Sequence, residues 1–228
     1  PSVLGTAMSS PIMASPSGGL RAPPVEADIG VARATKAKSQ NQIVSTQMSD
    51  GLEDIIEARG APVWFQLYTT NRIEATRTLV QRAQRAGCTV VCVTVDLPAG
   101  RNTVTASRLR RADTRVCGNC HVTDANGNPR QNISIKPMFT GLDTNGLGLT
   151  SPSLSWDFIK RLKDMTTMKV VIKGIEARED AELAVENGAD GILVSNHGGR
   201  ALESGRGTVE SLPDVVRGAA GRIPVMVD

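Results

Sequence analysis

The stretch Gly191-Ile192-Leu193-Val194-Ser195-Asn196-His197-Gly198-Gly199-Arg200 joins a short apolar run to a polar, glycine-rich turn. Four consecutive apolar residues that end at a turn are typical of a strand covered on both faces, as in a parallel sheet. The turn contains a histidine, which exchanges protons near neutral pH, and an arginine, which binds a carboxylate through two parallel hydrogen bonds. The stretch therefore indicates a catalytic pair at the end of a buried strand. The alternative is a hydrogen-bonded loop histidine beside a surface arginine, with glycines that only shape the turn.

The same succession of an apolar run, polar residues and an amphipathic segment recurs along the chain. Seven strands are predicted, at Pro11–Ser15, Gln42–Ser45, Pro62–Tyr68, Thr89–Asp96, Lys169–Gly174, Gly191–Val194 and Ile223–Asp228. Helical spacing follows every strand but the last and predicts helices at Glu26–Lys38, Asp50–Arg59, Asn71–Ala86, Ser153–Met165, Ala177–Asn187 and Val209–Gly218. Asn71 is the expected N-cap of the third helix, because its side chain can accept a hydrogen bond from the first turn.

Between Leu97 and Pro152 the periodicity disappears. A segment of this length without regular structure is uncommon inside a compact domain. We therefore expect a functional lid, an insertion or a disordered segment there.

The alternation of strands and helices predicts an α/β protein of the (β/α)8, or TIM-barrel, class. A doubly wound open sheet is the alternative, but the Gly-x-Gly-x-x-Gly fingerprint is absent after the first strand. Seven strands do not close a barrel. We therefore expect residues 1–228 to form one partial barrel domain, truncated at both ends, with a long loop insertion at about 97–152 and the eighth unit beyond Asp228.

The composition narrows the classes of molecule that the protein is expected to bind. The chain has 228 residues, of which 40% are hydrophobic and 21% charged, with a net charge of +3. Aromatic residues make up only 3%, so the stacking platforms that bind single-stranded nucleic acid are not expected. No apolar run reaches the length of a membrane span, and the start lacks a signal-peptide pattern. We expect a cytoplasmic protein without a nucleic-acid partner.

The motifs together resemble the FMN-dependent α-hydroxy-acid dehydrogenase family, which includes glycolate oxidase, lactate oxidase and mandelate dehydrogenase. The resemblance rests on Ser195–Arg200 with Lys173-Gly174, and on Pro16–Gly18, Ser45, Phe65–Tyr68, Thr94–Asp96 and Leu154–Trp156. It implies FMN as cofactor and oxidation of a small L-2-hydroxy acid to the 2-oxo acid. The electron acceptor would be oxygen, a quinone or a cytochrome, and the family resemblance implies a homo-oligomer, by analogy a tetramer. A phosphate-binding barrel with isomerase or lyase chemistry, and an inactive fragment, are the alternatives.

The resemblance also implies the role of each residue in catalysis. His197 would take a proton from the substrate, and Asp96 would orient the imidazole and stabilise its protonated form. Arg200 would bind the substrate carboxylate, and Tyr68 would hydrogen-bond the substrate near its oxygens. Lys173 would lie near N1 and O2 of the flavin, where a cation stabilises the reduced ring.

Further residues would contact the cofactor. Ser45, Gln66 and Thr94 would bind the polar edge of the flavin. Ser17 and Gly18 would lie against its face. Ser195 and Asp228 would contact its ribityl chain. Asp228 would begin the ribityl and phosphate site.

Two features of the long segment depart from the family. Arg101 occupies a position shifted from the family's second carboxylate-binding arginine, and either it or Asn102 would replace that residue. Cys117-Gly118-Asn119-Cys120-His121 has the Cys-x-x-Cys-His pattern of c-type haem attachment, through Cys117, Cys120 and His121. A redox pair, half a metal site and two unremarkable thiols are the alternatives, and we expect no metal elsewhere. Cys88 and Cys92 fall at a predicted buried strand and should be inert.

Overall fold

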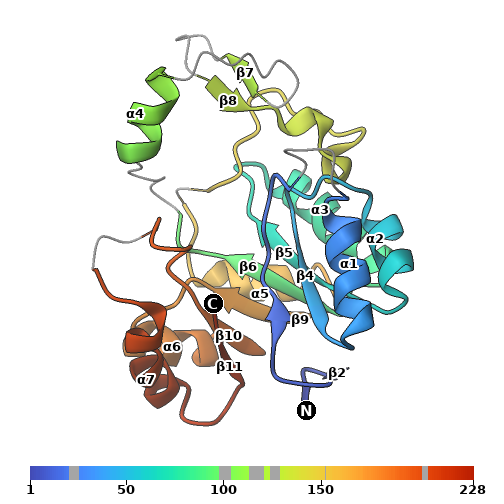
Figure 1. Cartoon of the computed structure of the whole chain (residues 1–228). Helices are drawn as coiled ribbons and strands as arrows, with labels where there is room; N and C mark the ends of the chain where they lie inside the picture. Colours follow the sequence, from blue (N-terminus) through green and yellow to red (C-terminus); the bar gives the residue numbers. More distant parts are fainter. Residues whose placement is uncertain (21–25, 98–103, 113–120, 124–128, 152, 202–204) are drawn as a thin grey trace.

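The computed structural model describes residues 1–20, 26–97, 104–112, 121–123, 129–151, 153–201 and 205–228 (Figure 1). Its centre is a curled sheet of seven parallel strands in the order β11-β10-β9-β6-β5-β4-β3. The strands are β3 (Met13–Ala14), β4 (Asn41–Ser45), β5 (Trp64–Tyr68), β6 (Val90–Thr94), β9 (Lys169–Lys173), β10 (Gly191–Val194) and β11 (Val225–Val227). All seven predicted strands are confirmed.

The strand order distinguishes a barrel-type sheet from a doubly wound one. Each strand lies beside its neighbour in sequence, and the order never reverses, as it must at the switch point of a doubly wound sheet. Six helices cover the outside: α1 (Asp28–Ala37), α2 (Leu52–Arg59), α3 (Ile73–Arg85), α5 (Asp157–Lys163), α6 (Arg178–Glu186) and α7 (Thr208–Ala219) (Figure 1). The six predicted helices and the barrel class are therefore confirmed.

Side chains alternate between two separate cores on the two faces of the sheet. The outer core, between strands and helices, contains Phe65, Val91 and Ile172. The inner core contains the intervening residues, namely Ile43, Trp64, Val90, Cys92, Val171 and Leu193. Burial on both faces explains why β6 and β10 are apolar along nearly their whole length rather than alternating.

A small hairpin that the sequence did not predict covers the inner core at the amino ends of the strands. It pairs β1 (Ser2–Val3) with β2 (Thr6–Ala7). Val3 and Leu4 pack against the inner core, and the Trp64 indole nitrogen donates to Thr6 Oγ1 at 2.8 Å.

The segment from 97 to 152, expected to be a lid, an insertion or a disordered segment, contains regular structure in its described parts. It contains α4 (Val104–Ala112), the antiparallel strands β7 (His121–Thr123) and β8 (Pro129–Gln131), and two 3-10 turns, η1 (Ile133–Ile135) and η2 (Pro137–Phe139). Met138 and Phe139 are buried in the outer core. These elements are too short to show a clear period in sequence.

Asn71 does not cap α3, which corrects the sequence prediction. The N-cap position is Arg72, and no side chain caps the helix. Asn71 Nδ2 instead donates to the Gly146 carbonyl at 3.0 Å, and its Oδ1 accepts from the Gly148 N–H at 2.9 Å. Arg72 also pairs with Asp143 at 3.1 Å. The two residues fasten the returning end of the long segment to the barrel.

The two edge strands, β3 and β11, flank a groove of about 490 Å³ lined by residues that include Met13, Ile43 and Met226. Near their carboxyl ends, Ser15 Oγ donates to Asp228 Oδ2 at 2.6 Å. Among the described residues, no helix is both long and apolar enough to cross a bilayer.

Candidate active site

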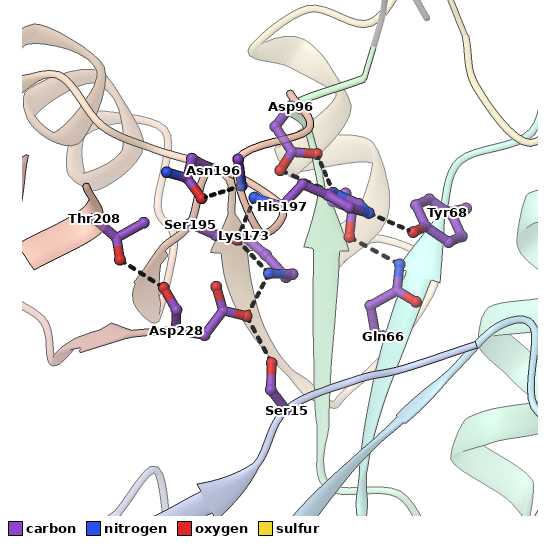
Figure 2. A network of polar contacts seen from close by, with 12 residues as sticks. Ser15, Gln66, Tyr68, Asp96, Lys173, Ser195, Asn196, His197, Thr208 and Asp228 are labelled. Carbon is purple, nitrogen blue, oxygen red and sulfur yellow. Dashed lines mark hydrogen bonds and ion pairs between the residues drawn. The ribbon is translucent and has the colours of Figure 1, made fainter. Parts of the chain in front are cut away.

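Polar side chains at the carboxyl ends of the strands meet above the inner core (Figure 2). The strand register accounts for this, because it places Ser45 beside Gln66, Tyr68 beside Thr94, and Thr94 beside Lys173. Ser195 and Asp228 directly follow β10 and β11. The carboxyl face of a barrel is where active sites of this fold class lie.

His197 is held between an acid and a phenol. Its Nδ1 lies 3.0 and 3.1 Å from the two carboxylate oxygens of Asp96, and its Nε2 lies 3.1 Å from the Tyr68 hydroxyl. The side chains of His197 and Asp96 are only 12% and 2% exposed. A carboxylate accepts hydrogen bonds, so Nδ1 carries a proton. In the neutral imidazole Nε2 is then the acceptor, and it faces the Tyr68 hydroxyl at the carboxyl end of the sheet.

Lys173 is a buried cation with two partners. It is 5% exposed, and its Nζ donates to Ser195 Oγ and to Asp228 Oδ2, the latter at 2.6 Å. Burial alone would raise the pKa of the Asp228 carboxyl, but hydrogen bonds from Lys173 and Ser15 outweigh burial and lower the pKa below its ordinary value of 3.8. The Asp228 carboxyl therefore remains ionised at neutral pH and forms an ion pair with Lys173 at the carboxyl end of the sheet.

A row of hydrogen bonds fixes the Gln66 amide. Its Oε1 accepts from Ser45 Oγ at 3.1 Å and from the Thr46 N–H at 3.3 Å, and its Nε2 donates to Thr94 Oγ1 at 2.8 Å. Ser45, Gln66 and Thr94 are all buried. The row offers donors and acceptors of fixed orientation beside Lys173, as the polar edge of a flavin ring requires.

Asp96 approaches Gly174 so closely that no side chain fits there. A Cβ at Gly174 would lie 2.7 Å from Asp96 Cβ and 3.0 Å from both Asp96 Cγ and Asp96 N. Gly174 also has φ +109°, in the region that L side chains rarely adopt. The carboxylate that orients His197 is therefore packed against the backbone at the end of β9.

The remaining predicted site residues lie around this centre or outside the described part. Ser17 and Gly18 are exposed, and Gly18 lies against the end of β4, since a Cβ there would be 3.1 Å from Gln47 Cβ and 3.6 Å from Ser45 Oγ. Arg200 is exposed, three residues after His197.

The two features that depart from the family pattern lie largely outside the described residues. Arg101, Asn102, Cys117 and Cys120 lie outside them, and His121 begins β7. The predictions made for these residues remain predictions.

Sequence reasoning missed three residues of the site. Ser15 accompanies Asp228, Gly174 makes room for Asp96, and Asn196 bonds the turn after β10. Ser15 ends a predicted strand, so the rule that polar residues gather at strand ends could have found it. Gly174 acts through the space it leaves for Asp96, and the Asn196 side chain acts by bonding the backbone of a turn; residue type alone reveals neither role.

Comparison with known proteins places this geometry in a family. The family model described as FMN-dependent dehydrogenase matches residues 1–228. The chain belongs to the FMN-dependent dehydrogenase family. A similar relative within it, peroxisomal (S)-2-hydroxy-acid oxidase GLO4 of Oryza sativa subsp. indica, is 37% identical over 99% of this chain and 60% of its own length. L-lactate oxidase of Nostoc sp. is 32% identical over 100% of this chain and 62% of its own length.

Solved structures agree with this assignment to the FMN-dependent dehydrogenase family. Mandelate oxidase with (S)-2-phenylpropionate superimposes with a TM-score of 0.77, at 30% identity over 100% of this chain and 60% of that one. A variant of mandelate oxidase with an FMN adduct gives the same TM-score of 0.77, at 30% identity over 99% of this chain and 60% of that one. The chain thus spans about 60% of the length of the curated relatives it matches.

Proposed function

We propose that this chain binds FMN and oxidises a small L-2-hydroxy acid to the 2-oxo acid. The observation that carries the proposal is the alignment Asp96–His197–Tyr68 at 3.0 and 3.1 Å beside the buried ammonium of Lys173. This arrangement places an oriented base and a cation together at the carboxyl end of the sheet. The names of the relatives, 2-hydroxy-acid, lactate and mandelate oxidases, support the same reaction class.

The side chains at the carboxyl end of the sheet fit a flavin. Lys173 would face N1 and O2 of the ring, and the fixed row Ser45–Gln66–Thr94 would bind the polar edge of the pyrimidine. Ser17 and Gly18 would lie against the ring face, and Ser195 and Asp228 would reach the ribityl chain. When bound, FMN supplies the electron acceptor that the twenty side chains lack.

Substrate would be bound by its carboxylate and deprotonated by His197. Arg200 would hold the carboxylate through its guanidinium fork, and Tyr68 would hydrogen-bond an oxygen of the substrate. Because the Tyr68 hydroxyl lies 3.1 Å from Nε2 in this structure, substrate would have to displace that contact before Nε2 could accept a proton. Asp96 then stabilises the imidazolium that forms.

The visible absorption spectrum of the purified protein, supplied with FMN and then with L-lactate, tests the proposal. We expect flavin bands that bleach when the hydroxy acid is added. For His197→Ala we expect loss of bleaching and turnover with flavin still bound, because His197 Nε2 is the proton acceptor. A protein that stays colourless in the presence of FMN would refute the proposal, and unchanged turnover in His197→Ala would refute the role of His197.

The carboxylate role of Arg200 has a separate test. We expect Arg200→Lys to raise KM for the hydroxy acid and to lower kcat, since an ammonium cannot reproduce the two parallel hydrogen bonds. Arg217→Lys is the matched control, because Arg217 forms a surface ion pair with Asp214. If Arg200→Lys and Arg217→Lys have the same kinetics as the wild-type protein, Arg200 does not bind the carboxylate.

A further inference from the structure

The turn that carries His197 has left-handed backbone geometry over three successive residues. The φ angles of His197, Gly198 and Gly199 are 61°, 71° and 71°. For a residue with a Cβ this geometry costs about 1–2 kcal/mol and persists only where neighbouring contacts impose it. The side-chain contacts with Asp96 and Tyr68 do not fix the backbone. The His197 N–H donates to Ser195 Oγ at 3.2 Å, and the left-handed residues that follow need further bonds to hold them.

Asn196 supplies the bonds that close this turn. Its Oδ1 accepts from the Gly199 N–H at 2.8 Å, while its backbone carbonyl accepts from the N–H groups of Arg200 at 3.0 Å and Ala201 at 3.2 Å. Three successive N–H groups, those of Gly199, Arg200 and Ala201, thus bond to one asparagine. The positions of His197 and Arg200 relative to each other depend on these bonds.

Asn196 also fixes the turn to the outer layer of the barrel. Its Nδ2 donates to the Arg206 carbonyl at 3.1 Å. The Arg206 side chain in turn donates to the Glu210 carbonyl at 2.8 Å and to Asp214 Oδ2 at 3.0 Å, both on α7. Figure 2 shows Asn196 on the side of His197 away from Tyr68. The asparagine therefore connects the turn to a helix without reaching the reacting atoms.

We propose that Asn196 is a positioning residue that holds the imidazole of His197 and the guanidinium of Arg200 in their working arrangement. An asparagine suits this task because one planar amide both accepts from Gly199 and donates to Arg206. The proposal rests on the proposed function for the catalytic roles of His197 and Arg200. A misplacement of about 1 Å in such groups can lower the rate by about 100-fold.

Kinetics of three variants in the flavin-loaded protein test the effect on turnover. We expect Asn196→Ala to lower kcat by about 100-fold and to raise KM, with FMN affinity retained. Asn196→Asp keeps the acceptor for Gly199 and loses the donor to Arg206, so its loss should be smaller. Asn187→Ala is the matched control, since Asn187 also donates to a backbone carbonyl, that of Leu183 at 2.8 Å in α6, and should behave as wild type.

Nuclear magnetic resonance of the imidazole gives a readout that needs no turnover. The chain has only two histidines, so a ¹⁵N-histidine spectrum is assigned with the single variant His121→Gln. We expect the wild-type His197 to show one tautomer, with a protonated Nδ1 and an acceptor Nε2. In Asn196→Ala the two ring-nitrogen signals should move toward the averaged positions of an exchanging imidazole.

The outcomes separate this inference from the proposed function. Wild-type imidazole signals in Asn196→Ala would overturn the positioning role, whatever the activity. If Asn196→Ala does not fold, Asn196→Asp decides, and wild-type kcat, KM and signals in that variant would overturn the role. A disturbed tautomer in Asn196→Ala, together with a wild-type protein that turns over no 2-hydroxy acid, would support positioning while refuting the proposed function.

Discussion

Replacing Gly174 with alanine should displace Asp96 and so disable His197. The added Cβ would lie 2.7 Å from Asp96 Cβ and 3.0 Å from Asp96 N. Carbon atoms in contact prefer about 3.5–4.0 Å, so Asp96 has to retreat by about 1 Å. Its neighbour Val95 is bonded through its N–H to the Lys173 carbonyl at 2.9 Å, so the two strand ends cannot separate freely. The carboxylate that holds His197 Nδ1 takes up the movement.

The magnitude has two parts, which a second variant separates. The left-handed φ of +109° makes an alanine unfavourable by about 1–2 kcal/mol, and overpacking adds about 1–3 kcal/mol. Gly87 has a similar φ of +99°, yet a Cβ there meets nothing within 4 Å. Gly87→Ala should therefore lower the free energy of unfolding only by the backbone contribution, without the overpacking contribution. A displacement of about 1 Å predicts a kcat about 100-fold lower for Gly174→Ala, with wild-type kcat for Gly87→Ala.

Denaturant unfolding and steady-state kinetics on both variants provide the assay. We expect Gly174→Ala to be the less stable of the two and to be the only one with impaired turnover. If Gly174→Ala turns over as fast as Gly87→Ala, Asp96 is not displaced, and the close packing does not position the acid.

The remaining predictions concern buried titratable groups. Burial raises the pKa of Asp28 from its ordinary 3.8, with Asp50 adding to the rise and the Ser49 N–H opposing it. A raised carboxyl pKa favours the protonated folded form, so the free energy of unfolding falls as pH rises from 3.8 through the folded pKa. Asp28→Asn, which keeps an acceptor for Ser49, should stabilise the protein above that window and not below it; urea unfolding without a gain at neutral pH would contradict this. Burial also raises the pKa of the Cys88 thiol to about 12 and that of Cys92 further. Iodoacetamide should therefore label neither thiol in the native protein at neutral pH and both in urea, and native labelling of Cys92 in mapped peptides would show that the inner core opens.

The elements that could be predicted from the sequence are those with a local signal. The long strands contain apolar runs because they are buried on both faces, as in Val90–Val93 of β6. The two-residue strands of the β1–β2 hairpin are too short for any period to show. Asn71 carries the residue type of an N-cap, but its partners lie 75 and 77 residues away, at Gly146 and Gly148. No local pattern distinguishes these two roles.

Some residues of the candidate site are likewise recognisable from the sequence, and others only from the folded structure. Histidine, lysine and arginine at strand ends are recognisable because few residue types perform proton transfer or anion binding. The contact between Gly174 and Asp96 depends instead on how closely two neighbouring strand ends approach, and the role of Asn196 depends on the handedness of a turn. Both require the folded backbone.

The β1–β2 hairpin closes the amino ends of the strands to ligands. Together with Trp64, it covers the inner core at the amino ends of the strands, and the cluster above it is fully apolar. Within the described residues, the groove between β3 and β11 is lined by Ser15 and Asp228, and Asp228 accepts a hydrogen bond from Lys173. This side of the sheet is therefore approached without a passage through the amino ends of the strands. Under the proposed function, the 2-oxo acid and the next hydroxy acid would bind the same groups, Arg200 and His197, so the product should compete with the substrate for the site.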